Sequence, residues 1–524
     1  MKINFSFYII LLFTLSICSQ ESTKIQIDSA GFFEKNDLKL SNATILTRDN
    51  NKRVKISHDG VYLWCNQAYF YENKNYIEAF GNVRMLQGDT LNLTSNYLEY
   101  NGDNKQAYAK GNVELIEPNS ELYTESLYFD RNKQEVFYNN NGKVIKYPKD
   151  TIYSQIATYY LDFKKYAFEN NVILNNPKYK ILTKKLDFYT ELGYAYFYGP
   201  TNIYSDDSNI YSELGFYNTN KDVGHFTKNS RVDYNNSSVY ADSIYFERNK
   251  KFASATKNIR IIDTINENVT RGNYAEIYRA KDSMFITNKA IIASKQDVDS
   301  LYIHSDTIVI TGKENKRVIR AYYDAKIFKK NISGRADSIH YNKFLGLAKF
   351  INLNKKNDLS FSTKKKPIIF NYENQITGDT IHLIFNKQNN IDSLKVFNNS
   401  FILQKDSLGD GFNQISGKIL LGKFKESQLS TININKNAES IYYLRNDEKE
   451  LVTIDRSKSA KLKIYFLNNN IDKIQKINQI DGRTYPEADF TENLKILKGF
   501  NNRLNEKIKN ISELFKKNKE IKNN

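Results

Sequence analysis

The sequence predicts an all-β protein: an elongated body built from repeated β-strand units, with a short helical tail at its C-terminus. Three observations support this prediction. The 524 residues include 38 Tyr and 32 Phe but 6 Pro, and aromatic residues favour half-buried, pleated strands. One polar position recurs along most of the chain at a nearly constant step, which indicates a repeat architecture. After residue 490 the apolar spacing changes from two to three and four, which is a helical period.

Residues 1–19 are predicted to be a signal peptide. Lys2 precedes an apolar run from Phe5 to Ile17, and the small and polar residues that follow suit a cleavage site. That run is shorter than the roughly 20 residues needed to span a bilayer. The letters LSIC resemble a lipoprotein processing box, although Ile17 stands where that box has a small residue. We therefore expect an exported, periplasmic protein, and we leave open lipidation of Cys18 and association with the outer membrane.

The repeat is strictest between residues 25 and 250. Its marker position falls, in steps of 29, 30, 29, 29 and 29 residues, on Asn96, Glu125, Gln155, Lys184, Glu213 and Asp242. Between residues 251 and 480 the repeat is looser, with steps of 31, 33, 31 and 42 residues to Asn273, Asp306, Asp337 and Asp379. These spacings predict two regions of one kind of β repeat.

Two apolar positions follow each marker, two and four residues further on. Side chains two apart in a strand point to the same face of the sheet. Stacked repeats would therefore enclose an apolar interior between two β walls. The clearest pairs, which are the candidate site residues, are Leu98, Tyr100, Leu127, Phe129, Leu186, Phe188, Ile244 and Phe246. The alternative that these side chains fill a dry core stays open.

The turns of the repeat are of two kinds. Polar turns such as NGDNKQ, DRNKQ and ERNKK follow the apolar pairs. Pairs such as Gly81-Asn82 and Gly111-Asn112 are expected to mark where each repeat turns over, because Gly and Asn tolerate positive φ.

Residues 490–524 are predicted to form a basic amphipathic tail, helical or partly disordered. Apolar residues recur there at steps of three and four, opposite a Lys-rich face: Leu494, Leu497, Phe500, Leu504, Ile508, Ile511 and Phe515. Gly499 and several Asn weaken a helix, which favours a docking segment over a membrane anchor.

No catalytic site, metal site or cofactor is predicted. Asp242 and Ser243 look like a carboxylate beside a nucleophilic hydroxyl, but sister repeats hold Asn, Gln or Lys at the marker position. A catalytic carboxylate is tuned by one particular pocket and does not recur in this way. The five His residues are scattered, without the Cys/His spacing of a zinc site. We therefore expect a protein that is not an enzyme.

The net charge of +17 is spread along the chain rather than concentrated in one block. In an exported protein this charge does not indicate a nucleic-acid partner, whereas phosphorylated lipids or an anionic membrane surface fit it. The alternative, a chain that is simply rich in Lys, stays open.

Five segments carry a family resemblance: AFGNVRMLQGDTLNL (79–93), GNVELIEPNSELYTESLYFDRN (111–132), FYGPTNIYSDDSNIYSELGFYNT (197–219), LYIHSDTIVI (301–310) and YPEADFTENLKILKGF (485–500). They resemble the OstA-like family of exported Gram-negative proteins, which includes the organic-solvent-tolerance domain of the lipopolysaccharide-transport bridge. The resemblance extends from about residue 25 to 500 and implies a β-jellyroll. In such a fold two antiparallel sheets form a V that holds lipid A acyl chains. Cys65-Asn66-Gln67-Ala68 departs from the family pattern, which has an Asp-Ser-Ala box there.

By this resemblance, the leading hypothesis is a non-enzymatic periplasmic component of lipopolysaccharide transport or outer-membrane assembly. Its partners would be lipopolysaccharide or lipid A and the transport proteins of the inner and outer membranes, and the eight candidate residues would line the lipid groove. The alternative is a structural β-solenoid spanner or adhesin whose open sheet edges bind protein partners. The chain could also associate end to end with itself.

Overall fold

The computed structural model describes residues 23–35, 42–148, 150–295, 299–313, 316–353, 366–388, 390–406, 408–426, 428–446, 448–468 and 470–516. The predicted signal peptide lies outside these residues. The chain divides into two compact units, Met1–Tyr198 (unit 1) and Gly199–Asn524 (unit 2). This boundary differs from the predicted change in repeat regularity near residue 250, which stays a prediction.

Unit 1 contains β1 (Gln26–Ser29), β2 (Phe32–Lys35), β3 (Thr44–Thr47), β4 (Val54–His58), β5 (Val61–Cys65), β6 (Gln67–Tyr71), the 3-10 turn η1 (Glu72–Lys74), β7 (Tyr76–Gln87), β8 (Leu91–Asn101), β9 (Gln106–Glu117), β10 (Ser120–Asp130), β11 (Glu135–Tyr138), β12 (Gly142–Lys146), β13 (Asp150–Ser154), β14 (Ile156–Tyr160), β15 (Lys165–Asn176) and β16 (Tyr179–Tyr189). The boundary between the units falls within β17 (Tyr194–Ser205).

Unit 2 contains β18 (Ser208–Asn218), β19 (Val223–Tyr234), β20 (Ser237–Glu247), β21 (Phe252–Asp263), β22 (Asn268–Tyr278), η2 (Arg279–Lys281), β23 (Ser283–Ser294), β24 (Leu301–Thr311), β25 (Val318–Lys329), β26 (Ile332–Asn342), β27 (Leu347–Ile351), β28 (Ile368–Asn371), β29 (Asn374–Thr377), β30 (Thr380–Phe385), β31 (Ile391–Lys405), β32 (Phe412–Lys425), β33 (Gln428–Arg445), β34 (Leu451–Leu467), β35 (Asn470–Ile477) and β36 (Asp481–Tyr485). Short 3-10 turns follow: η5 (Glu487–Asp489), η6 (Glu492–Leu494), η7 (Leu504–Glu506) and η8 (Ile511–Phe515).

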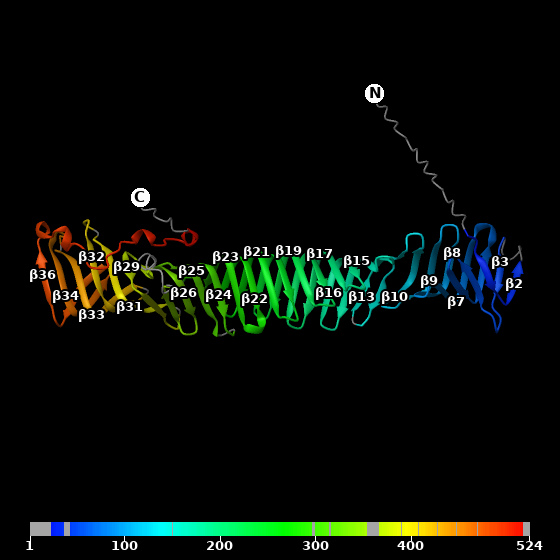
Figure 1. The fold of residues 1–524 in the computed structure, drawn as a ribbon, viewed down its shortest axis with the longest axis horizontal. Helices are drawn as coiled ribbons and strands as arrows, with labels where there is room; N and C mark the ends of the chain where they lie inside the picture. The colour runs from blue at the N-terminus through cyan, green and yellow to red at the C-terminus, as the bar shows by residue number, and fades with distance from the viewer. Residues whose placement is uncertain are drawn as a thin grey trace, which may run out of the picture. The chain divides into compact units, whose positions relative to one another are not determined.

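In the regular part of the fold, each repeat is a pair of long antiparallel strands joined by tight hairpins. In unit 1, β7 to β10 pair in sequence order, and in unit 2, β18 to β26 do the same (Figure 1). The 29-residue period is therefore the length of two strands and their two turns. Neighbouring strands pair edge to edge, so the apolar residues of successive repeats form one continuous face.

The long strands bend in the middle. Pairing between β20 and β21 is interrupted between Tyr240 and Ser243, and the break divides each strand into two arms. Opposite the break, Lys257 and Asn258 have φ of 61° and 50°, and in β7 Gly81 and Asn82 have φ of 72° and 46°. Such bulges bend a strand sharply. The Gly/Asn pairs therefore lie at a corner in the middle of a strand, and not at the end of a repeat.

The marker residues lie at these corners. Asp242 Oδ2 accepts a hydrogen bond from Asn258 Nδ2 at 2.9 Å. Two other repeats show the same contact: from Asn229 Nδ2 to Glu213 Oε1 at 2.8 Å and from Asn399 Nδ2 to Asp379 Oδ2 at 2.8 Å. The marker side chain thus supports the left-handed Asn on the next strand, which explains why several polar residue types serve at this position.

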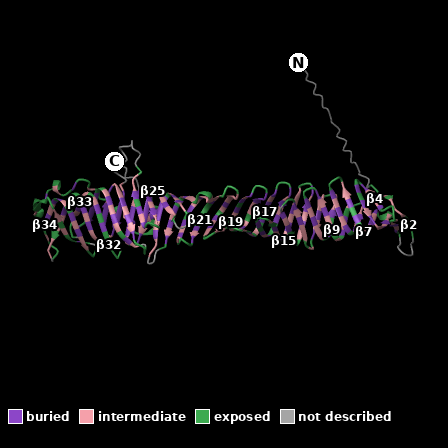
Figure 2. Ribbon diagram, turned by 90° about the horizontal axis from the view of Figure 1, so that it is seen from below, coloured by how far each residue is buried: buried purple, intermediate pink, exposed green. Residues whose placement is uncertain are grey.

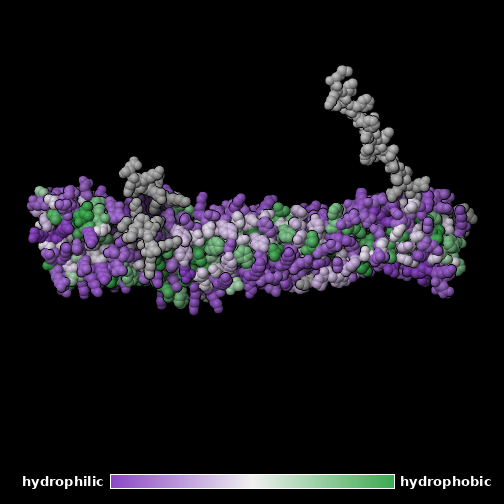
Figure 3. Space-filling model, in the orientation of Figure 1, coloured by the Kyte–Doolittle hydropathy of each residue, from purple (hydrophilic) through white to green (hydrophobic). Residues whose placement is uncertain are grey.

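The core follows the predicted spacing of two along each arm (Figure 2). In unit 1, buried aromatic rings stack on one another, with ring centroids 4.0 Å apart for Tyr159 and Tyr166 and 5.3 Å apart for Tyr166 and Phe168. In unit 2, one apolar cluster runs from Val239 to Ile471. The opposite faces of the strands are mainly hydrophilic, with scattered apolar residues (Figure 3). The all-β class is therefore confirmed.

The C-terminal tail differs from the predicted amphipathic helix. Residues 486–516 form an extended strap interrupted by 3-10 turns of three to five residues. From the predicted stripe, Leu497 and Ile508 are buried, whereas Ile511 and Phe515 are each 40% exposed. Leu514, outside the stripe, is fully buried. Contacts with the sheet set this conformation, because no continuous helix would place these residues on the strands that they contact.

Side chains of the sheet hold the backbone of the strap. Gln414 Nε2 donates to Lys495 O at 2.6 Å while Gln414 Oε1 accepts from Leu497 N at 2.9 Å. Gln375 binds the strap in the same way further along the chain: its Nε2 donates to Asn501 O, and its Oε1 accepts from Arg503 N. These amides provide the donor and acceptor that a neighbouring strand would otherwise supply. No helix in the described part of the chain has the length and apolar character needed to cross a membrane.

Candidate functional site

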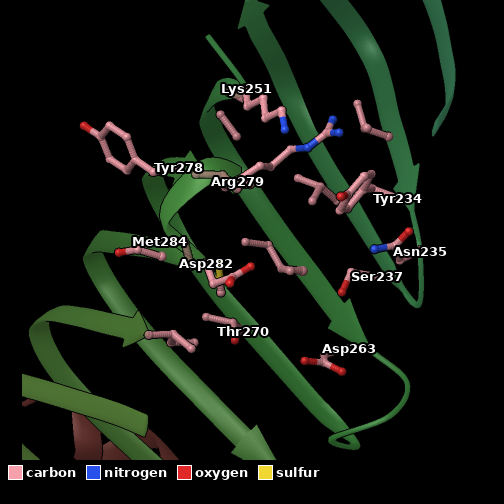
Figure 4. Close-up of a pocket in the computed structure, with 18 of the residues that line it drawn as sticks. Tyr234, Asn235, Ser237, Lys251, Asp263, Thr270, Tyr278, Arg279, Asp282 and Met284 are labelled. Atoms are coloured by element: carbon pink, nitrogen blue, oxygen red, sulfur yellow. The ribbon is translucent and has the colours of Figure 1, made fainter. Parts of the chain in front are cut away.

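Unit 2 contains a cavity of about 510 Å³ that is lined by strands β18 to β25 (Figure 4). Val239, from the first arm of β20, and Ile244 and Phe246, from its second arm, line the same space, so the two arms face each other across it. On β21, Ala253 and Ala255 pair with Phe246 and Ile244 and leave room beside them. The cavity lies within the usual range for small-molecule sites, roughly 300–1,000 Å³.

Hairpins at the tips of the two arms surround the mouth of the cavity. One row of hairpins provides the acidic rim, which we define in unit 2 as Asp207 and Asp263. The opposite row provides the basic rim, Arg248, Lys251, Arg279, Arg317 and Lys343. Charged side chains thus stand at the edge of an apolar space, which is the arrangement expected of a site for an amphiphile.

Ion pairs join the two rims, and we call these pairs cross-rim clasps. Arg279 pairs with Asp207, and Arg248 Nη1 lies 3.5 Å from Asp207 Oδ1. Arg317 pairs with Asp263. Each clasp therefore connects hairpins that are two or more strands apart in the sequence.

The environment of Asp207 favours its charged form. Burial alone would raise the pKa of this carboxyl, but the hydrogen bond from Arg279 and the charges of Arg279 and Arg248 together lower it. Asp207 therefore stays ionised at neutral pH. Its side chain is 42% exposed, compared with 9% for Asp263, so the Asp207 clasp is the more accessible of the two.

The structure divides the eight candidate residues into two groups. Ile244 and Phe246 line the cavity of unit 2. The other six, Leu98, Tyr100, Leu127, Phe129, Leu186 and Phe188, belong to unit 1 and are 0–5% exposed. All eight point into the interior, as the spacing of two predicts, but a cavity is found beside the pair in unit 2.

Tyr100 shows how the tips of the arms meet in unit 1. Its hydroxyl lies 2.6 Å from His58 Nδ1 and accepts a hydrogen bond from Arg131 Nη1 at 2.9 Å. Burial raises the pKa of Tyr100, although the charge of Arg131 opposes this. Two further clasps lie at the tips in this unit, between Lys105 and Asp59 at 2.5 Å and between Lys164 and Glu117 at 2.6 Å.

No catalytic arrangement emerges at Asp242 and Ser243, since both contact only architectural neighbours in the described contacts: Asp242 is bonded to Asn258, and Ser243 Oγ to His225 Nε2 at 2.9 Å. Within the described residues, no group of three or more His, Cys, Asp or Glu side chains could hold a metal ion.

The clasps are the residues that the sequence analysis missed. Their cations lie in the polar turns that follow the apolar pairs, such as Lys105 in NGDNKQ and Arg248 in ERNKK. A basic residue recurs in these turns, whereas Asp59, Glu117, Asp207 and Asp263 recur in the alternate turns. This alternation of charge between odd and even turns is the signal that could have revealed two oppositely charged rims.

Three comparisons with known proteins bear on the chain. Residues 22–184 match the family described as OstA-like protein. No curated protein matches. Among solved structures, the chain is similar to LptH of Pseudomonas aeruginosa, the LptA-homologous periplasmic component of the lipopolysaccharide transport device. The identity is 14%, over 26% of this chain and 93% of that one, with a TM-score of 0.23. The family match confirms, over residues 22–184, that this chain resembles the OstA-like proteins.

Proposed function

We propose that the protein is a non-enzymatic periplasmic component of lipopolysaccharide transport or outer-membrane assembly, and that it shields lipid acyl chains between the two arms of its strands. The observation that carries this proposal is the cavity of unit 2. It has an apolar wall that includes Ile244 and Phe246 and a mouth bordered by the basic rim. Acyl chains fit the wall, and lipid phosphates fit the guanidinium and ammonium groups. The OstA-like match of residues 22–184 supports the same role.

Under this proposal the partners are lipopolysaccharide or lipid A and the transport proteins of the two membranes. The six candidate residues of unit 1 would contact lipid only when the arms part, because their side chains are buried in the described state. Unit 2 is therefore where a bound lipid is easiest to detect.

A photo-crosslinking experiment in cells tests the proposal. A benzoylphenylalanine at Phe246, which lines the cavity, should capture lipopolysaccharide. The matched control is Tyr245, one residue earlier on the opposite face of β20, where capture should be absent. If the folded Phe246 variant captures no lipopolysaccharide, or if both positions capture it equally, the proposed lipid groove is wrong.

A second candidate function rests on the edge strands. In the described residues, β2 pairs with β3, and β35 and β36 each pair with β34. Strands with an open edge can receive a strand from another chain. A structural spanner or adhesin would use these edges, and the same crosslinker placed in them would capture protein and no lipid.

A further inference from the structure

Arg279 occupies a special position at the mouth of the unit 2 cavity. Its guanidinium pairs with Asp207 on the opposite rim and lies over the Tyr234 ring, with Cζ 3.8 Å from the ring centroid (Figure 4). Its Nε is buried without a hydrogen-bond partner among the described residues. The cation–π contact with the ring restricts the positions that the guanidinium and its donors can take. Among the described residues, the Nε donor of this cavity-lining side chain thus remains unused.

The charge around Arg279 is unbalanced. Six cations line the cavity and its mouth, Arg248, Lys251, Arg279, Lys313, Arg317 and Lys343, against three acids, Glu247, Asp263 and Asp282. With Asp207 added, the cations still outnumber the acids. A site with this excess attracts an anion, and the apolar wall below it accepts the anion's hydrocarbon part.

A second residue, Asn268, also indicates that the cavity accepts a polar ligand group. Asn268 lines the cavity and is 8% exposed, and its Oδ1 has no hydrogen-bond partner among the described residues. A buried polar atom without a partner is costly. A ligand that carries hydroxyl or amide donors beside its anionic group would satisfy this acceptor.

We propose that the Asp207–Arg279 clasp is a latch for an anionic amphiphile. In the empty state Arg279 binds Asp207 and holds the two rims together. On binding, the guanidinium exchanges the Asp207 carboxylate for the phosphate of the ligand headgroup, so that headgroup binding and opening of the mouth occur together. No covalent bond changes in this exchange. The proposal rests on the proposed function and adds to it the residue pair that controls access.

Accessibility of the two clasps explains why the latch is at Asp207. An exposed ion pair contributes little to stability, whereas a buried pair is costly to break by removal of one partner. Asp207 is 42% exposed and Asp263 is 9% exposed. The Asp207 clasp can therefore open without disturbing the fold, while the Asp263–Arg317 clasp remains closed.

Fluorescence titration of the full chain with two pyrene-labelled lipids tests the latch. Phosphatidic acid and diacylglycerol carry the same acyl chains, and only the former carries a phosphate. Arg279→Gln opens the clasp for both lipids but removes the charge-assisted contact with the phosphate. It should therefore lower the preference for phosphatidic acid over diacylglycerol about fivefold or more. Asp207→Asn should strengthen phosphatidic acid binding about threefold, because the carboxylate no longer competes for Arg279.

The matched control is Arg260→Gln, which removes the same charge from the exposed outer face of β21 and should change neither affinity. Circular dichroism of each variant checks folding. Asp207→Asn and Arg279→Gln should change the preference for phosphatidic acid in opposite directions, so if one variant fails to fold, the other still tests the latch. If both lipids bind but neither substitution separates them, the latch is overturned and the proposed groove stands. If neither lipid binds the unmodified chain, the groove itself is overturned.

Discussion

Single residues in this fold have roles that their chemistry alone does not reveal. Asp242 beside Ser243 looks reactive, yet it supports the corner by accepting a bond from Asn258. Ile244, two positions on, is 2% exposed and lines the cavity. The contribution of each residue to the stability of the fold therefore depends on which face of the strand it occupies.

This difference predicts unequal effects of substitution. Asp242→Ala removes one exposed hydrogen bond and should lower the free energy of unfolding by about 0.5 kcal/mol or less. Ile244→Ala enlarges an interior space and should lower it by about 2–4 kcal/mol. Urea unfolding of both variants measures the two effects. Equal losses at the two positions would contradict the assignment of Asp242 to the corner.

His304 predicts a dependence of stability on pH. Burial, together with the charge of Lys326, lowers its pKa below the ordinary value of 6.5, against opposing contributions from its bond to Ala290 O and from Asp324 and Asp306. Because the folded state binds the proton less tightly than the unfolded state, stability is present above pH 6.5 and decreases as the pH falls below it.

The end of the strap should respond first to this titration, because the Phe515 ring packs on His304 with centroids 4.7 Å apart. The hydrogen-exchange protection factors of the amides of residues 511–516, which are corrected for the pH dependence of intrinsic exchange, should fall between pH 7 and pH 5. His304→Asn should flatten this dependence, whereas the control His225→Asn, at an exposed ring bonded to Ser243, should not. An unchanged dependence in His304→Asn would mean that another group controls the strap.

At the scale of elements, the strap forms a third layer over part of unit 2. It covers a second apolar cluster, Phe401, Leu403, Ile441 and Ile454, with Phe490 and Leu497. Its far end is held by Lys326, which is 1% exposed, is paired with Asp324 at 2.8 Å and donates to Leu514 O and Lys516 O at 2.9 Å each. A buried ammonium with three partners fixes the end of an otherwise extended segment.

Removal of the strap should therefore expose an apolar face without unfolding the sheet. A chain that ends at Pro486 should keep its β circular dichroism, bind more of the dye ANS and aggregate more readily, because the cluster loses its cover. Lys326→Met, which removes the charge but keeps the length, should release residues 511–516 alone in hydrogen exchange. Loss of β structure in the truncated chain would show instead that the strap is required for folding.

The elements also show how far the sequence predicts this fold. The period and the inward pairs were predictable, because strand alternation and corner residues are local signals. The strap was not, because its 3-10 turns follow contacts with Gln375 and Gln414 that lie far away in the chain. The clasps were missed for the same reason. Arg279 and Asp207 are 72 residues apart, and local sequence patterns do not predict contacts between residues so far apart.

At the scale of the whole molecule, the repeats leave open strand edges at the beginning and the end of the described chain. Near the beginning, β2 pairs with β3 within the described residues, and its Phe32 and Phe33 are 63% and 61% exposed. Near the end, β35 and β36 each pair with β34. Exposed edges with aromatic side chains favour association with another strand.

We therefore expect the chain to associate with itself through β2. Replacement of both Phe32 and Phe33 by Lys should shift the sedimentation of the full chain toward the monomer, because charged residues on an edge strand oppose pairing. The control replaces Tyr323, at the corner of β25, and Phe344, in the turn after β26, by Lys; these residues are 62% and 68% exposed. It adds the same charge away from the edge and should leave the assembly unchanged. Sedimentation velocity at several concentrations compares the two variants. The +17 charge of the chain opposes association at low salt, so the difference in assembly between the β2 variant and the control variant should grow with ionic strength. A loss of assembly in the control variant would indicate general repulsion rather than a β2 contact.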